Sequence, residues 1–185
     1  MKIKKANISF IEYVSLKDRS EYDYLLKYGG LKADDYFNLG DFLNLEFGFI
    51  KDMQEHLNYT GLDWQTYLEE ISKHTRKDLK KLANIGIFDL YQSRLYLRQE
   101  IERITKLESS NLGHKASIEE EQAGIEVFDK YRSFLQFDHL TKGNIIKIND
   151  IRKIKYSICF TKLMLDADRS EFDNKLFNIR NKKKK

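Results

Sequence analysis

The clearest pattern of hydrophobic positions lies between residues 87 and 107, where apolar side chains recur every three or four residues. This spacing is typical of an amphipathic helix with one face in a core. A second pattern follows Ser117, whose Ser-Ile-Glu-Glu sequence is a capping box, and it continues to about Leu140. The polar segment 109–114 joins the two patterns. Together they predict a long antiparallel helical hairpin.

Shorter amphipathic patterns predict further helices on both sides of this hairpin. The expected helix starts are Ser15, Asp41, Asp63 and Asn149, with a short basic helix over 76–82 and a last helical piece around 172–179. Expected ends contain Gly or Asn, as at 29–30 and 142–144. The aromatic stripe of 42–57 and the lone Trp64 are interpreted as core positions. The chain contains no proline, so the strongest helix breaker is missing, although AT-rich coding bias explains part of that absence.

The first 15 residues have a different character. They mix alternating and continuous apolar positions, which favours an extended segment over a helix. A lone strand needs a partner, so this arm is expected to pair with another subunit or to lie on a helical surface. At 185 residues the chain has the length of one domain. We therefore expect a mainly α, single-domain helical bundle: an extended arm over 1–15, a helical domain over 16–179 and a basic disordered tail over 180–185.

Membrane and disulfide chemistry are not expected. No run of about 18 apolar residues occurs, and the N-terminal segment does not continue as a signal peptide. The pattern predicts a protein made in a cytoplasm, without a membrane partner. The single cysteine, Cys159, excludes an internal disulfide and a cysteine zinc site, and it is interpreted as a small buried apolar residue.

The sequence contains no constellation that indicates catalysis. The histidines His56, His74, His114 and His139 stand in separate segments, without the spacing of metal ligands. An acidic cluster over 166–173 lacks the glycine and distal glutamate of a calcium loop, so it is interpreted as the cap of a helix joint. Glycine-rich phosphate loops and nucleophile elbows are also missing. We expect a non-enzymatic protein without metal, cofactor or small-molecule substrate; an enzyme would have to assemble its site from distant residues.

The charge is unevenly distributed. The chain carries a formal net charge of +4, while residues 151–185 contain 11 Lys and Arg against four Asp and Glu, a net of +7. Basic segments attract phosphate or acidic surfaces, and no cluster suited to reading base edges accompanies them. Non-specific DNA binding is therefore one hypothesis, and a solubilising terminus is the other. The candidate DNA contacts are Arg152, Lys153, Lys155, Arg180, Lys182, Lys183, Lys184 and Lys185.

Three segments, 123–131, 140–147 and 155–163, carry a resemblance to a known class of proteins. They resemble small helical virion proteins of tailed bacteriophages, of the crAss-like or a related podovirus type. The resemblance covers the C-terminal third of the chain and consists of packing patterns, so no site residue follows from it. It implies a structural or assembly subunit of the head, neck or tail, such as a head-tail connector, acting as one copy in a ring.

The expected function is accordingly a structural or assembly role in a phage particle. Other virion proteins and further copies of the same chain are the expected partners, and the virion is the expected location. The alternative is a helical protein that associates with nucleic acid through its basic C-terminal region.

Overall fold

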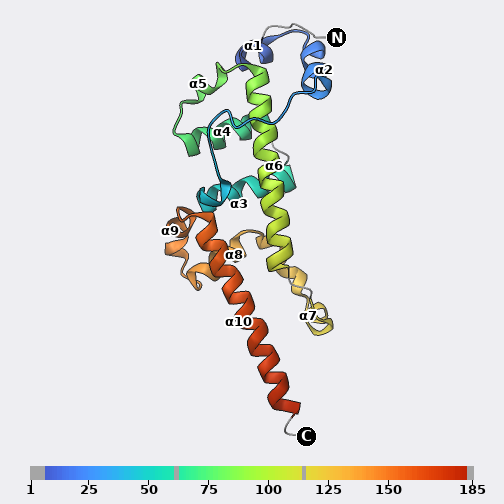
Figure 1. The fold of residues 1–185 in the computed structure, drawn as a ribbon, viewed down its shortest axis with the longest axis vertical. Coiled ribbons are helices and arrows are strands. Elements are labelled where there is room, and N and C mark those ends of the chain that lie inside the picture. Colours follow the sequence, from blue (N-terminus) through green and yellow to red (C-terminus); the bar gives the residue numbers. More distant parts are fainter. Residues whose placement is uncertain (1–6, 61–62, 114–115, 183–185) are drawn as a thin grey trace. The chain divides into compact units, whose positions relative to one another are not determined.

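The structure is a computed structural model and describes residues 7–60, 63–113 and 116–182. Within these ranges the chain is mainly helical and has no β-strand, which confirms the mainly α part of the expected fold class. Isolated antiparallel bridges join Ser9 to Gly86 and Glu46 to Lys155. No helix in these ranges combines the length and hydropathy needed to cross a bilayer. The elements in chain order (Figure 1) are α1 Phe10–Ser15, α2 Ser20–Tyr28, η1 Phe42–Asn44, α3 Phe47–Glu55, η2 His56–Thr60, α4 Trp64–Thr75, α5 Leu79–Ala83, α6 Ile87–Leu112, α7 Ile118–Gln122, η3 Ile125–Tyr131, α8 Phe134–Thr141, η4 Ile145–Lys147, α9 Ile148–Arg152 and α10 Tyr156–Lys182.

The chain divides into two compact units. Unit 1 comprises Met1–Phe42 and His56–Arg103, and unit 2 comprises Leu43–Glu55 and Ile104–Lys185. The long helix α6 contributes its first part to unit 1 and its last part to unit 2. Each unit has buried aromatic residues of its own, so each is held by its own apolar core.

In unit 1, aromatic side chains gather around the start of α6. Tyr13, Tyr22 and Leu26 pack with Ile87 in one buried cluster. Trp64 packs against the edge of this cluster, with its ring centroid 5.4 Å from that of Phe10. Trp64 was interpreted from the sequence as a core residue; it packs against the core cluster but is only partly buried.

The extended N-terminal arm is not confirmed. Residues 10–15 form α1, because Ser9 caps the helix and Glu12 completes a capping box. Just before α1, the backbone pairs with its own chain: the Ile87 amide donates to the Ile8 carbonyl at 2.8 Å. The short extended segment thus finds its partner beside the start of α6, within unit 1. Residues 1–6 of the expected arm lie outside the described residues.

Unit 2 is organised around Phe47 at the start of α3. Its ring lies 5.3 Å from that of Phe137 in α8 and 5.8 Å from that of Tyr156 in α10. The Phe47 amide donates to the Ile154 carbonyl, and the Tyr156 amide donates to the Leu45 carbonyl, both at 2.8 Å. These two bonds hold the beginnings of α3 and α10 side by side, which fixes the direction in which α10 leaves the core.

The long antiparallel hairpin is not confirmed either. Its first helix is present as α6, and the capping box at Ser117 is present at the start of α7. The expected second helix, however, is divided into α7, η3 and α8. Gly124 has a φ of 80° and Arg132 a φ of 48°, and a residue with positive φ cannot continue a right-handed helix.

Several expected helix boundaries also differ. Asp63 caps α4 as predicted, whereas α2 begins at Ser20 and not after Ser15. Two helices were expected around 150–165 and 172–179. In the structure the break lies earlier, because α9 ends at Arg152 and α10 runs without interruption from Tyr156 to Lys182. The acidic residues of 166–173 therefore lie inside one helix and not at a joint. No glycine interrupts residues 156–182, so the local sequence permits this length.

Candidate functional site

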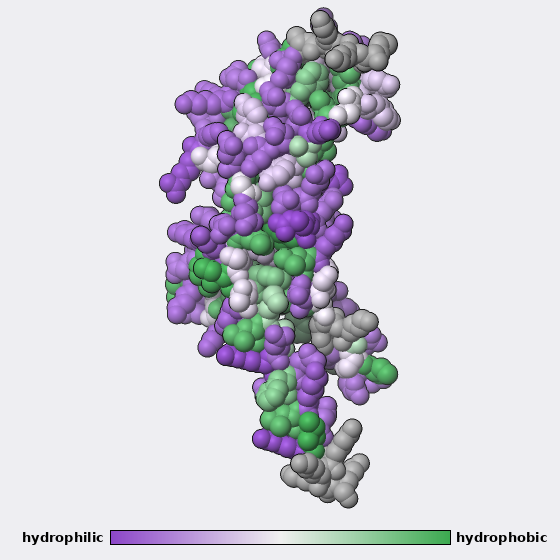
Figure 2. Space-filling view, in the orientation of Figure 1, coloured by the Kyte–Doolittle hydropathy of each residue, from purple (hydrophilic) through white to green (hydrophobic). Residues whose placement is uncertain are grey.

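One face of α10 carries large apolar side chains that remain exposed to solvent. Four of them follow one another at intervals of seven residues: Ile158, Leu165, Phe172 and Ile179 are 58%, 43%, 63% and 54% exposed. Leu176 lies between the last two and is partly buried. These five residues are called the α10 stripe below. Figure 2 shows apolar surface over the C-terminal part of this helix.

The α10 stripe faces away from the core of unit 2. Tyr156, Cys159, Phe160 and Leu163 form the buried face of α10. Because each residue advances about 100° around a helix, the stripe is centred roughly 180° from this buried face. Intramolecular packing in unit 2 therefore occupies one side of the first turns of α10 and leaves the stripe in solvent.

Ion pairs along α10 support the helix where packing ends. Lys162 bonds the Asp166 carboxylate, and Glu171 pairs with Lys175, each four residues apart. The Lys175 partner lowers the pKa of Glu171. The pKa of Asp166 is lowered mainly by its bond to Lys162 and to a lesser degree by its bond to His139. Pairs of this kind stabilise a helix only slightly, and most helical stability in proteins comes from packing of an apolar face. The C-terminal half of α10 thus has apolar residues at helical spacing, but Phe172 and Ile179 of this row remain exposed.

A second feature is a buried polar cluster in unit 2, called the Lys51 cluster. The Lys51 ammonium donates to Glu108 and, at 2.9 Å, to Gln54 Oε1. Gln54 Nε2 donates to Glu108 Oε2 at 3.0 Å, and the Tyr156 hydroxyl donates to Glu108 Oε1 at 2.6 Å. The Lys51 side chain is 3% exposed, with its ammonium 5.3 Å from the centre of the Phe47 ring. The cluster joins α3, α6 and α10 inside unit 2.

Burial lowers the pKa of Lys51, and the nearby Glu108 carboxylate opposes this effect. A lysine of lowered pKa can act as a base or a nucleophile when a substrate reaches it. Here the ammonium is enclosed and bonded to a carboxylate, so its arrangement supports a structural role. Sequence reasoning missed it. The available signal was a lysine placed one helical turn after Phe47, within the apolar stripe of α3.

Unit 1 contains a cavity of about 430 Å³ beside α6 and η2. The charged residues that line it, Arg94, Arg98 and Glu102, have partners within unit 1. Arg98 Nε bonds Glu102 Oε1 at 2.8 Å, which neutralises part of the positive charge. The Arg94 guanidinium lies 4.8 Å from the Trp64 ring centre, and burial lowers its pKa. The lining residues are Leu57, Asn58, Tyr91, Arg94, Leu95, Arg98 and Glu102.

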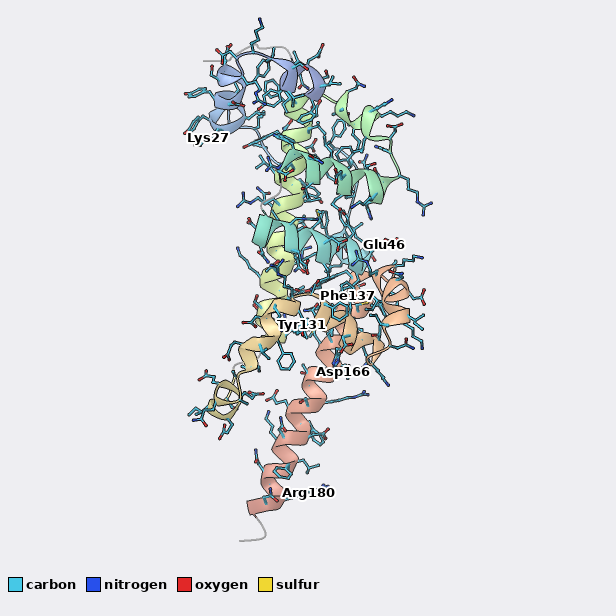
Figure 3. All side chains as sticks on the ribbon, turned by 180° about the vertical axis from the view of Figure 1, so that it is seen from behind. Lys27, Glu46, Tyr131, Phe137, Asp166 and Arg180 are labelled. Atoms are coloured by element: carbon cyan, nitrogen blue, oxygen red, sulfur yellow. The ribbon has the colours of Figure 1, made fainter. Side chains whose placement is uncertain are left out.

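Among the residues that the structure describes, the basic side chains predicted to contact DNA are not brought together into one patch. Arg152 bonds Asp52, and its guanidinium lies 5.3 Å from the Phe137 ring centre, so it is used within unit 2. Lys153 and Lys155 are exposed near the start of α10, and Lys155 Nζ lies 3.4 Å from Asn44 Oδ1. Arg180 is exposed near the other end of the helix (Figure 3). Lys182 is the last residue of α10, and Lys183, Lys184 and Lys185 lie outside the described residues.

The three histidines in the described ranges remain in separate places. His139 Nε2 lies 2.9 Å from Asp166 Oδ2, and His56 Nε2 lies 4.0 Å from Glu70 Oε1. His74 is in α4, and His114 lies outside the described residues. In the described part of the chain, no three His, Cys, Asp or Glu residues are placed to hold a metal ion.

Cys159 is 3% exposed, which confirms its interpretation as a buried residue. Burial raises the pKa of its thiol to about 11, against a smaller opposing effect of Lys51. A thiol of raised pKa is a poor nucleophile at neutral pH, because only the thiolate attacks.

Comparison with known proteins adds no family to this description. No protein-family model matches the chain, and no curated protein and no solved structure matches it significantly.

Proposed function

We propose that this protein is a non-enzymatic structural or assembly subunit of a phage particle, such as a head-tail connector, neck or other ring component. It works by contact with other virion proteins and with copies of itself. The observation that carries this proposal is the α10 stripe, an exposed apolar face on a helix whose other face is packed.

The physical argument is the free energy of exposed apolar surface. Burying the side chain of a residue such as Phe172 or Ile179 gives roughly 1.5 to 3 kcal/mol relative to leaving it in water. A row of such side chains at helical spacing is the usual form of a helix that docks on a partner. The resemblance of segments 123–131, 140–147 and 155–163 to phage virion proteins is the reason for proposing a phage particle as the place of that partner.

Particle fractionation tests the proposal. Cells producing the particles are lysed, particles and assembly intermediates are separated on a density gradient, and the chain is quantified by mass spectrometry. We expect it at a constant ratio to the capsid proteins in one or more particle fractions. Recovery only among free proteins would contradict the proposal. A Phe172→Asp variant should lose incorporation, whereas the matched exposed variant Asn174→Asp, on the side of α10 opposite the stripe, should keep it.

The second candidate function is non-specific association with DNA. It is favoured by the net charge of +7 over residues 151–185 and by the exposed Lys153, Lys155 and Arg180. Duplex DNA binding at two salt concentrations, with and without residues 180–185, tests it. Phosphate contacts weaken steeply as salt rises, so true binding should fall with salt and with deletion. If the full-length chain fails to bind at low salt, the DNA hypothesis is wrong and the basic tail only makes the chain more soluble.

A further inference from the structure

We propose that the α10 stripe pairs with the same stripe of a second copy of this chain, with the two helices antiparallel. This inference deepens the proposed function, because it names one partner of the contact surface. It rests on the spacing, exposure and flanking charges of α10 alone.

The stripe has the seven-residue spacing of one row of a coiled-coil seam. Its exposed residues Ile158, Leu165, Phe172 and Ile179 repeat every seven residues and take the d positions of a heptad. The a positions, four residues after each of the first three d positions, are Lys162, Arg169 and Leu176. Such a seam is completed by side chains from a second helix, which insert between those of the first.

An antiparallel partner places each a residue beside a d residue of the other helix. We align the two helices with the two-fold axis between residues 170 and 171. Leu165 then lies opposite the partner's Leu176, and Phe172 lies opposite the partner's Arg169. A guanidinium on the face of a phenylalanine ring is a favourable contact. By symmetry each of these layers occurs twice, so one pairing covers most of the stripe.

The charges beside the seam favour this direction. In an antiparallel pair, positions g of the two helices face each other, which brings Asp168 beside the partner's Lys175, twice by symmetry. Positions e also face each other, which brings Asp166 beside the partner's Arg180, again twice. Asp173 meets the partner's Asp173 once, at the two-fold axis, as the single like-charge contact among these flanking positions.

The parallel direction is disfavoured by the same residues. In a parallel pair, position g faces position e of the next heptad, so Asp168 meets the partner's Asp173 and Lys175 meets the partner's Arg180. Each of these like-charge contacts occurs twice, and Arg169 faces the partner's Arg169 within the seam. Charges at e and g set the orientation of coiled coils, and here they select the antiparallel pair.

The pair should be weak and reversible. Two to three heptads with charged residues at two a positions form a short seam, so pairing depends on protein concentration or on the crowding of subunits in an assembly. A two-fold contact also closes on itself. It joins subunits in pairs, and a ring of such pairs would need a second interface elsewhere on the chain.

Charge reversal tests the direction by sedimentation equilibrium of the full chain. Asp168→Lys and Lys175→Glu each replace both attractive g contacts by repulsive ones, and each should weaken self-association roughly tenfold. An equimolar mixture of the two variants restores opposite charges between chains only, so the mixture should associate about as well as the original protein. Parallel pairing predicts the reverse for Asp168→Lys, since the introduced ammonium would then attract the partner's Asp173.

Cysteine cross-linking gives an independent test in a Cys159→Ala background. Leu165→Cys and Leu176→Cys should form an intermolecular disulfide only when the two variants are mixed, because each position faces the other across the pair and the two cysteines must lie within about 7 Å between Cα atoms. Each variant oxidised alone should remain uncrosslinked. Cross-linking of either variant with itself would indicate a parallel pair. Asn174→Cys, on the side of α10 opposite the stripe, is the control and should not cross-link in either case.

The outcomes separate this inference from the proposed function. A chain that stays monomeric at the highest soluble concentration, or that cross-links only in the parallel sense, overturns the antiparallel pair. The same chain found at a constant ratio in particles would still support the structural role. Conversely, an antiparallel dimer absent from every particle fraction supports the pairing and contradicts the particle role.

Discussion

The buried Lys51 ammonium donates a hydrogen bond to Glu108, which lies 57 residues further along the chain. This contact ties α3 to the end of α6 within unit 2, and Tyr156 of α10 bonds the same carboxylate. Two charges removed from water are costly unless each is paired and hydrogen-bonded. The Lys51 cluster therefore makes the folding of unit 2 depend on three segments that are far apart in the sequence.

Glu108→Gln should destabilise unit 2 by about 3 to 5 kcal/mol, because it leaves the Lys51 charge buried without a carboxylate. The double variant with Lys51→Met should recover more than half of that loss, since neither charge is then buried. Urea unfolding followed by circular dichroism measures both. Glu102→Gln is the control: its pair with Arg98 is exposed, so the change should stay within about 0.5 kcal/mol. Equal losses for the two glutamates would refute the buried pair.

The thiol of Cys159 should make stability fall at alkaline pH. Its pKa is raised from 9.0 to about 11 by burial, so the folded chain holds this proton more tightly than the unfolded chain. The contribution is fully present below pH 9 and is lost as the pH rises towards 11. Unfolding measured across this window should show a smaller fall for Cys159→Ala than for the original protein. The single cysteine also allows a direct check by thiolate absorbance, and titration near 9 in the folded chain would disprove the shift.

Asp63 should contribute to stability as the cap of α4. Its carboxylate accepts the Thr66 amide hydrogen at 2.8 Å, and this bond is the main cause of its lowered pKa. Asp63→Ala should cost about 1 kcal/mol, whereas Asp63→Asn keeps a good cap and should cost little at neutral pH. A lowered pKa means that the extra stability of Asp63 is present above the unfolded value of 3.8 and is lost as pH falls below it. Thermal unfolding of the three proteins at neutral and acidic pH makes the comparison.

Phe137 and Phe134 lie three residues apart in α8 and should respond differently to truncation. Phe137 is 3% exposed and contacts Phe47, while Phe134 is 42% exposed. Phe137→Ala should therefore cost about 3 to 5 kcal/mol, through lost burial and the cavity left behind. Phe134→Ala should cost less than about 1 kcal/mol. Comparable losses in urea unfolding would mean that α8 does not pack through Phe137.

Local sequence was sufficient for features that depend on a few neighbouring residues. The capping box at Ser117, the cap at Asp63, the helix over 87–107, the stop at 142–144 and the burial of Cys159 were all predicted correctly. The capping box at Ser9 could have been predicted by the same rule, but the alternating apolar pattern around it favoured an extended arm. Of the two breaks in the expected second helix, the one at Gly124 falls on a residue type that permits it, whereas Arg132 takes a positive φ that its residue type does not indicate.

The candidate site, too, was visible in the sequence only in part. The seven-residue repeat of the α10 stripe is visible in the sequence, but periodicity cannot distinguish a buried face from an exposed one. Only the structure shows that Tyr156, Cys159, Phe160 and Leu163 occupy the core and leave the opposite face in solvent. The sequence shows Arg152 only as a basic residue in a basic segment, which made it a candidate DNA contact. The structure shows that it pairs with Asp52, 100 residues away in the sequence.

By itself, the sequence determined that this chain is helical, where several helices are capped and that its C-terminal region is basic. These properties follow from interactions among residues within one or two helical turns. The tertiary structure decided which apolar faces are buried, which charges are paired and that α10 is one continuous helix with an exposed stripe. Those properties depend on contacts between distant segments, such as Lys51 with Glu108, and burial is a property of the whole packed unit that local spacing does not encode.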